Sequence, residues 1–236
     1  MKPFVICHMM STVDGRIVGD RWSPPAAGDI WSTYGRDYEF IHDQLVGDAW
    51  LVGRKTMTEF AKGEPWLGLP TEGIDRNHYI ANTTARGYAI GIDAHGKLHY
   101  HTSVANGNHI IAVLSEAVED AYLAELRAGG ISYIFAGKTE VDLALALDIL
   151  GREFAINRLL LEGGGTINGA FLRAGLIDEL SLMLAPAVDG LRGVASVFDY
   201  DGPPGDATPK GLNVSLIDSE ARPNGVMWLR YSIVKA

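Results

Sequence analysis

The 236-residue sequence contains a single cysteine, Cys7, which excludes an intrachain disulfide and any site built from several thiolates. It also lacks long apolar runs, and no stretch approaches the roughly 18 uninterrupted apolar residues of a membrane-spanning helix. The apolar run at residues 4–10 is too short for a signal peptide and leads directly into Asp14-Gly15-Arg16. These absences predict a protein of the reducing cytoplasm that does not enter a membrane.

Positive charge is scarce as well. The 20 lysines and arginines are outnumbered by 29 aspartates and glutamates, which gives a formal net charge of −9. This balance repels a phosphate backbone, so nucleic acid is not expected as a partner. A small anionic ligand is still compatible with it, because a few local cations or backbone N–H groups create a positive pocket on a negative protein.

The sequence does contain an alternation of short apolar runs and amphipathic segments. Buried strands are predicted at residues 4–10, 49–52, 109–114, 131–136, 158–161 and 179–184. Helices are predicted at residues 37–45, 56–61, 118–128, 143–154 and 167–173. In the first of them, Tyr38, Ile41 and Leu45 form the apolar stripe. The alternation indicates an α/β fold in which helices flank a central, mostly parallel sheet, and we expect residues 1–236 to form a single domain.

The alternation is interrupted in two places. Residues 63–108 lose periodicity, apart from a short run at 78–81, and predict loops with one or two weak strands. Near the end of the chain, strand-like runs at 212–219 and 226–234 are joined by Arg222-Pro223-Asn224-Gly225, in which Asn-Gly is a strong hairpin signal. We therefore expect an antiparallel hairpin at the edge of the sheet.

The segment most informative about function is Glu162-Gly163-Gly164-Gly165-Thr166, between a predicted strand and a predicted helix. Consecutive glycines at a helix N-terminus present N–H groups that bind phosphate oxygens, although glycines also serve simple tight turns. Glu162 ends a buried strand and needs hydrogen bonds there, so we expect it to hold the loop or a ligand. The glycine spacing matches neither the Rossmann nor the Walker pattern.

A second strand-to-helix junction, Gly53-Arg54-Lys55-Thr56, combines a helix N-terminus with two cations. It suits a phosphate monoester such as the 2′-phosphate of NADP, although cations at a surface junction are more often merely solvated. Two such corners could hold opposite parts of one dinucleotide.

Polar residues also follow the first predicted strand. Ser11 and Asp14 are candidates for contacts to a substrate, although Asp14-Gly15 is also an ordinary turn signal. Hydride transfer needs only alignment and a proton source, and Asp14 is the candidate for supplying that proton or orienting a water.

Three strings carry a resemblance to a known family. S-T-V-D-G-R-I at residues 11–17, V-G-R-K-T at 52–56 and L-L-L-E-G-G-G-T-I-N-G-A-F-L-R-A-G-L-I-D-E-L-S-L-M-L-A-P at 159–186 resemble the reductase domain of riboflavin biosynthesis. The third string is the most specific. The zinc deaminase signature that accompanies this domain in bifunctional proteins is absent, and Phe60-Ala61-Lys62 replaces the family's usual acidic pair.

The resemblance implies a dihydrofolate reductase-like three-layer fold, a homodimer and an activity like that of 5-amino-6-(5-phosphoribosylamino)uracil reductase, in which NADPH delivers hydride to a C=N or C=O carbon. By match to the family's motifs, Gly163, Gly164, Gly165 and Thr166 would hold the diphosphate or nicotinamide side of NADPH. Gly53 and Thr56 would lie along the cofactor. Ser11 and Asp14 would face the substrate, with Arg36 as a looser candidate for its phosphate.

Two alternative functions are left open. One is dihydrofolate reduction, for which Asp37 or Glu39 on the first helix would supply the usual carboxylate. The other is a sensor that binds NADP without turnover. Residues 22–28 are either a lid over the substrate or a rigid surface loop. No metal site is expected at His95, His99 and His101, since no carboxylate-rich or thiol segment adjoins them.

Overall fold

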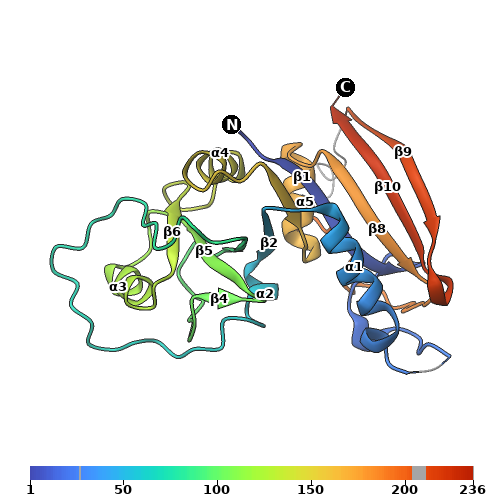
Figure 1. Ribbon diagram of the computed structural model, residues 1–236, viewed down its shortest axis with the longest axis horizontal. Helices are drawn as coiled ribbons and strands as arrows, with labels where there is room; N and C mark the ends of the chain where they lie inside the picture. The colour runs from blue at the N-terminus through green and yellow to red at the C-terminus, as the bar shows by residue number, and fades with distance from the viewer. Residues whose placement is uncertain (27, 204–210, 236) are drawn as a thin grey trace. The chain divides into compact units, whose positions relative to one another are not determined.

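A computed structural model describes residues 1–26, 28–203 and 211–235 (Figure 1). The chain divides into two compact units: unit 1 comprises Met1–Pro3 and Asp48–Leu159, and unit 2 comprises Phe4–Gly47 and Leu160–Ala236. Both units are α/β structures: the strands of unit 1 pair mainly in parallel, as the sequence predicts, and unit 2 combines one parallel pair with two long antiparallel strands. Within the described ranges, no helix is long and apolar enough to cross a bilayer.

Unit 1 is built around parallel strands in the order β2, β3, β5 and β6, with the short β4 antiparallel to β5. The strands are β2 Ala49–Gly53, β3 Tyr88–Ile92, β4 Val104–Ala105, β5 Asn108–Leu114 and β6 Ser132–Phe135. The helices are α2 Arg54–Met57, α3 Asp120–Ala128 and α4 Leu143–Glu153. Helix α4 begins at an Asp142 cap, whose carboxylate accepts the N–H groups of Ala144 and Leu145.

Strand β3 is stronger than its sequence suggests. It lies within residues 63–108, yet it pairs in parallel with both β2 and β5, and Ala89 and Ile90 are fully buried. Gly91 hides the strand from pattern analysis, because it interrupts the apolar run. A side chain at that position would collide with Met57 and Tyr100. The run at 78–81 contributes only an isolated bridge, from Tyr79 to Tyr133.

Unit 2 contains a parallel pair, β1 with β8, followed by the antiparallel strands β10 and β9. The strands are β1 Phe4–Thr12, β8 Glu179–Ala185, β9 Leu212–Ala221 and β10 Met227–Lys235, and β7 Arg158–Leu161 begins in unit 1 and ends in unit 2. The helices are α1 Arg36–Leu45 and α5 Gly165–Ala174, and the short helical turns are η1 Gly19–Arg21, η2 Trp31–Gly35 and η4 Pro223–Gly225.

The C-terminal antiparallel hairpin is confirmed. At its turn, Asn224 and Gly225 adopt φ angles of 60° and 79°, the left-handed conformation that Asn and Gly tolerate best. Helix α1 is also confirmed, and it buries Ile41 and Leu45 from the predicted apolar stripe. The helix predicted at 56–61 instead covers Arg54–Met57 and continues only as turns.

Candidate functional site

Three glycines form the corner between β7 and α5. Gly163 adopts a φ of 91°, which side-chain-bearing residues rarely take, and the Gly163–Gly164 peptide bond is cis. Helix α5 begins at Gly165 with Gly164 as its N-cap residue, and no side chain in the described part of the chain caps it. Because the N–H groups of a first helical turn have no acceptor within the helix, this corner can bind an anion.

Two glycines of this region are required by packing. A Cβ on Gly165 would collide with the carbonyl oxygen of Ser196, and a Cβ on Gly169 would collide with that of Asp199. The Asp199 N–H also donates to the Gly165 carbonyl at 3.0 Å. Residues 196–199 therefore lie against the first turns of α5, so Gly165 has a structural role besides its predicted contact to a cofactor.

Side chains from α1 hold the carboxylate that precedes the glycines. His42 Nδ1 lies 2.8 Å from Glu162 Oε1. The Tyr38 hydroxyl lies near the same carboxylate, and burial and the Glu162 charge raise the pKa of that hydroxyl. The two members of the ion pair are largely shielded, with 26% of the His42 side chain and 12% of the Glu162 side chain exposed. The hydrogen bond to Glu162 raises the pKa of His42, which favours the protonated imidazole. The predicted need of Glu162 for hydrogen bonds is therefore met by α1.

A buried polar chain continues from Tyr38 into the sheet of unit 2. The rings of Tyr38 and His8 stack with centroids 4.2 Å apart, and the Tyr38 hydroxyl donates to the His8 carbonyl at 3.2 Å. His8 Nδ1 lies 3.1 Å from Ser181 Oγ, which accepts a 2.9 Å hydrogen bond from Trp228 Nε1. Since the Trp228 N–H can only donate, Ser181 is free to donate its own hydrogen to His8 Nδ1. Burial lowers the pKa of His8, so its ring is neutral.

The structure gives Asp14 a structural role at the end of β1. Its exposed carboxylate accepts hydrogen bonds from Thr12 Oγ1 at 2.6 Å and from the N–H groups of Gly190 at 2.9 Å and Asp189 at 3.2 Å. These bonds, led by the one from Thr12, lower the pKa of Asp14 to about 2. The side chain is therefore ionised at neutral pH and connects β1 to the loop at residues 189–190.

The other two predicted substrate residues differ in accessibility. Ser11 is fully buried and donates to the Thr12 carbonyl at 3.1 Å. Arg36 is exposed at the first position of α1, and among the described residues no carboxylate lies within ion-pairing distance of it. Its guanidinium is available to an anionic group.

The second predicted corner lies in unit 1, after β2. Gly53 is the N-cap residue of the four-residue helix α2, and Arg54 and Lys55 are exposed at its start. Neither cation forms an ion pair with a carboxylate in the described ranges. Thr56, the last residue of the predicted motif, is half-buried. The exposed cations suit a phosphate monoester.

The loop at residues 22–28 is attached to the structure at its beginning. Trp22 is buried, and Ser23 exchanges two hydrogen bonds with the backbone of Val188, of 2.8 Å and 3.0 Å. Ala27 lies outside the described residues. These contacts favour the rigid-loop interpretation for the first two residues.

Two of the three histidines considered for a metal site, His95 and His99, have an acidic neighbour that the local sequence does not indicate. His99 Nδ1 lies 2.8 Å from Glu125, and His95 Nε2 lies 3.5 Å from Glu140. Each histidine faces a single carboxylate, and the described residues contain no group of three or more side chains arranged to hold a metal ion.

Sequence reasoning missed His42, Tyr38 and His8. Tyr38 was assigned to the apolar stripe of its helix together with Ile41 and Leu45, although its hydroxyl is polar. His42 follows Tyr38 by four residues, a spacing that places both on one face of a helix. The signal was therefore present, but nothing in the sequence connected this face to Glu162.

Comparisons with known proteins extend over most of the chain. The family model described as the RibD C-terminal domain matches residues 3–228. A 2,5-diamino-6-ribosylamino-4(3H)-pyrimidinone 5′-phosphate reductase from Methanothermobacter thermautotrophicus is 29% identical over 204 residues, which are 86% of each chain. The protein of the same name from Aquifex aeolicus is 25% identical over 204 residues, 85% of this chain and 84% of its own. The crystal structure of a pyrimidine reductase-like protein from Corynebacterium diphtheriae has a TM-score of 0.69 to this chain at 18% sequence identity. The alignment covers 99% of this chain and 93% of that protein, which shows a shared fold.

Proposed function

The chain belongs to the family of RibD C-terminal domains, and we propose that it reduces 2,5-diamino-6-ribosylamino-4(3H)-pyrimidinone 5′-phosphate, or its deaminated counterpart, with NADPH. The chain is an oxidoreductase acting on a small heterocyclic substrate, as the names of its relatives indicate. The observation that carries the proposal is the family match over residues 3–228, which includes both glycine-bearing corners. The same match supports the prediction that residues 1–236 act as one domain.

We assign the diphosphate or nicotinamide side of the cofactor to the corner of unit 2, formed by Gly163, Gly164, Gly165 and Thr166 after Glu162. The first turn of α5 fits an anionic group, because its N–H groups have no acceptor within the helix and no side chain of the described residues caps it. When bound, the cofactor supplies the hydride. The protein's part is to orient it and to exclude competing reactions.

We assign recognition of the phosphate that distinguishes NADPH from NADH to Gly53, Arg54, Lys55 and Thr56 in unit 1. Both cations are exposed and free of carboxylate partners among the described residues, so they can each form a charge-assisted hydrogen bond to a phosphate. Replacing both with alanine should raise the KM for NADPH about tenfold or more and leave the KM for NADH nearly unchanged. Arg152→Ala, on the exposed face of α4, is a matched control for charge removal.

On the substrate side, we propose roles for Ser11, Asp14 and Arg36. Since Asp14 is ionised at neutral pH, it orients a water that delivers the proton and does not act as the acid itself. The exposed guanidinium of Arg36 suits the substrate phosphate. Ser11 is buried, so its role is to fix the end of β1 through its bond to Thr12.

The proposal is tested by following NADPH absorbance with three substrates: the diamino pyrimidinone phosphate, its deaminated counterpart and dihydrofolate. Turnover of either pyrimidine compound, with product carrying a ribityl chain, supports the proposal. Turnover of dihydrofolate alone, abolished by Asp37→Asn or Glu39→Gln, would identify the folate alternative. NADPH binding without oxidation by any of the three would identify a sensor.

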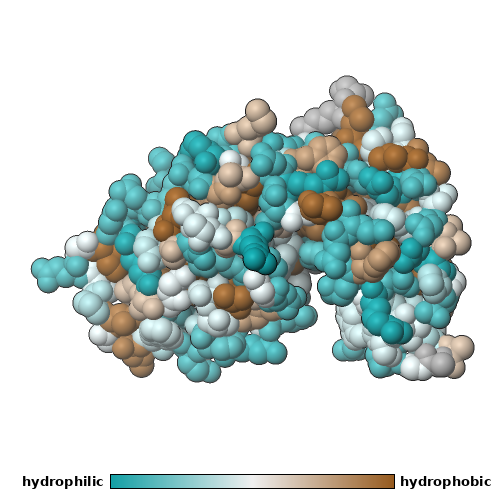
Figure 2. Space-filling model, in the orientation of Figure 1, coloured by the Kyte–Doolittle hydropathy of each residue, from teal (hydrophilic) through white to brown (hydrophobic). Residues whose placement is uncertain are grey.

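We also propose that the active form is a homodimer associated through the edge of the sheet in unit 2. Strand β9 is exposed along almost its whole length, and Figure 2 shows hydrophobic side chains over β9 and β10. Val214, Leu216, Ile217 and Val234 are each at least half exposed. An open apolar edge strand is normally covered by a partner.

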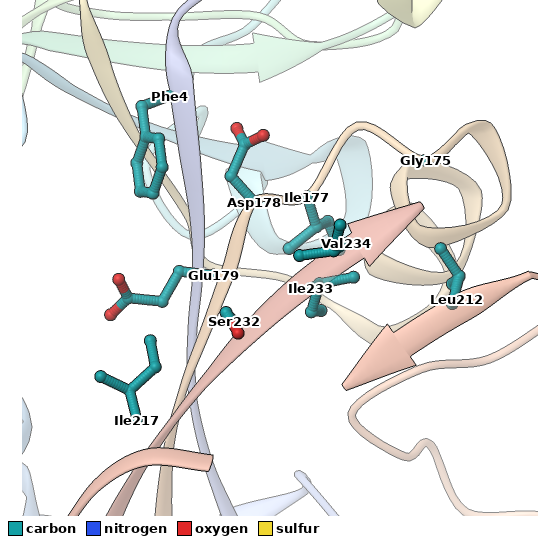
Figure 3. Close-up of a pocket in the computed structure, with 10 residues that line it drawn as sticks. All are labelled: Phe4, Gly175, Ile177, Asp178, Glu179, Leu212, Ile217, Ser232, Ile233 and Val234. Atoms are coloured by element: carbon teal, nitrogen blue, oxygen red, sulfur yellow. The ribbon is translucent and has the colours of Figure 1, made fainter. Parts of the chain in front are cut away.

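A depression of about 500 Å³ adjoins this edge. Figure 3 shows Phe4, Ile217 and Val234 among the residues that line it. Sedimentation velocity would measure the assembly, and Leu216→Lys should shift a dimer toward monomer. A wild-type protein that sediments as a monomer at assay concentrations would refute this part of the proposal.

A further inference from the structure

The glycine corner of unit 2 carries a histidine–glutamate ion pair whose net charge changes when the histidine loses its proton. Glu162 lies immediately before Gly163, and its carboxylate is joined to His42 at 2.8 Å. Both side chains belong to unit 2 and are largely shielded from water. A diphosphate at this corner would therefore experience the charge of the pair at short range, with less screening than at an open surface.

The charged and titratable groups that act on His42 lie on three parts of unit 2. Glu162 faces it from the corner, Glu39 and Asp43 lie on its own helix, and His8 faces it from β1. The three carboxylates favour the imidazolium, whereas His8 is buried and neutral. At lower pH the His42–Glu162 pair carries no net charge, and once His42 loses its proton the pair carries one negative charge.

We propose that His42 is a positioning residue of the cofactor corner: from α1 it holds the Glu162 carboxylate in place, and its protonation sets the charge that the corner presents to the anionic cofactor. This inference rests on the proposed function, since it concerns the same cofactor. The physical consequence is that NADPH binds more weakly as the pH rises through the pKa of His42, because the deprotonated pair repels the diphosphate.

The experiment measures the Kd for NADPH by calorimetry between pH 6 and pH 9, together with the titration of His42 by NMR in the protein without cofactor. In the wild type, the Kd should increase about three- to tenfold across the His42 transition. His42→Gln keeps a hydrogen-bond donor for Glu162 but no titrating charge, so its Kd should be almost independent of pH. His42→Lys retains a positive charge over this range, so its Kd should stay near the low-pH value of the wild type.

A matched control is available in unit 1. His99 and Glu125 form a pair with the same 2.8 Å Nδ1 to Oε1 distance and a similar shielding, with 25% and 5% of the two side chains exposed. His99→Gln should therefore keep the wild-type dependence of the Kd on pH, whereas a purely general effect of losing a histidine would alter both variants. In the NMR titration, Glu162→Gln should lower the pKa of His42.

The outcomes separate this inference from the proposed function. Wild-type protein that binds no NADPH at any pH overturns both. Wild-type binding whose pH dependence survives in His42→Gln overturns the role of His42 alone. A His42 titration that does not respond to Glu162→Gln shows that the pair is not formed in solution and overturns the inference even if NADPH binds well.

Discussion

Replacing Ser181 with alanine tests the buried polar chain of unit 2. The Ser181 hydroxyl joins two buried side chains: it accepts from Trp228 Nε1 at 2.9 Å and lies 3.1 Å from His8 Nδ1, which is 3.4 Å from the Ser181 carbonyl. His8 and Ser181 are fully buried and Trp228 is 8% exposed, so water cannot readily replace the hydroxyl. Each polar group left unpaired in the interior costs about 1–3 kcal/mol. For two such groups that share one partner, we expect Ser181→Ala to lower the free energy of unfolding by about 2–4 kcal/mol.

Urea denaturation followed by tryptophan fluorescence measures this change, because Trp228 is itself part of the chain. Ser232→Ala is a matched control: Ser232 lies on the neighbouring strand β10, and its hydroxyl makes only a 3.4 Å contact to the Ser215 carbonyl near the surface. We expect that control to change the free energy of unfolding by less than about 0.5 kcal/mol. A Ser181→Ala protein as stable as the control would show that the chain of hydrogen bonds contributes nothing, and the reasoning would be refuted.

Three further predictions concern packing and titration. Gly169→Ala should lower the free energy of unfolding by about 1–3 kcal/mol in urea titrations, because the added Cβ would collide with the Asp199 backbone. The control Gly129→Ala, whose Cβ would make only ordinary contacts, should change this free energy by less than about 0.5 kcal/mol. Cys7 should not react with a thiol reagent in the native protein and should react fully in denaturant, since burial raises the pKa of its thiol; rapid native labelling would contradict this. Asp14→Asn should lower kcat at every pH without changing the shape of the pH–rate profile between pH 5 and pH 9, because hydrogen bonds, led by that from Thr12, lower the pKa of Asp14 to about 2. Loss of a limb of that profile would contradict the assignment of Asp14 as an ionised group.

The sequence predicts the elements of this fold well wherever a strand or helix has a clear period. Helix α1 and the hairpin of β9 and β10 follow directly from spacing and turn chemistry. The sequence predicts only a weak strand where β3 lies, because Gly91 breaks its apolar run. The glycine is needed there because Met57 and Tyr100, which lie outside β3, pack against it. Tertiary contacts of this kind leave no local pattern.

The candidate site shows the same division. The burial of Glu162 at a strand end indicates that the carboxylate needs partners, and this follows from its position alone. The partners themselves, His42 and Tyr38, lie more than a hundred residues away, and only the fold brings α1 to the glycine corner. Gly165 is a further example. From the sequence, the reason for a glycine there is contact with a cofactor, whereas the structure adds close packing against residues 196–199.

These contacts also determine which group gives the corner its response to pH. Burial lowers the pKa of His8 more than the carboxylate of Glu162 raises it, so His8 stays neutral. Its ring contacts Ser181 on β8 and Tyr38 on α1 without carrying a charge. Tyr38 is kept protonated because burial and the same carboxylate raise the pKa of its hydroxyl. The hydrogen bond to Glu162 raises the pKa of His42 above its usual value, and the protonated form is the paired one. Its contribution to stability is therefore present at low pH and is lost as the pH rises through that pKa. Stability and cofactor affinity should therefore decline over the same pH interval in the wild type, and His42→Gln should remove both changes together.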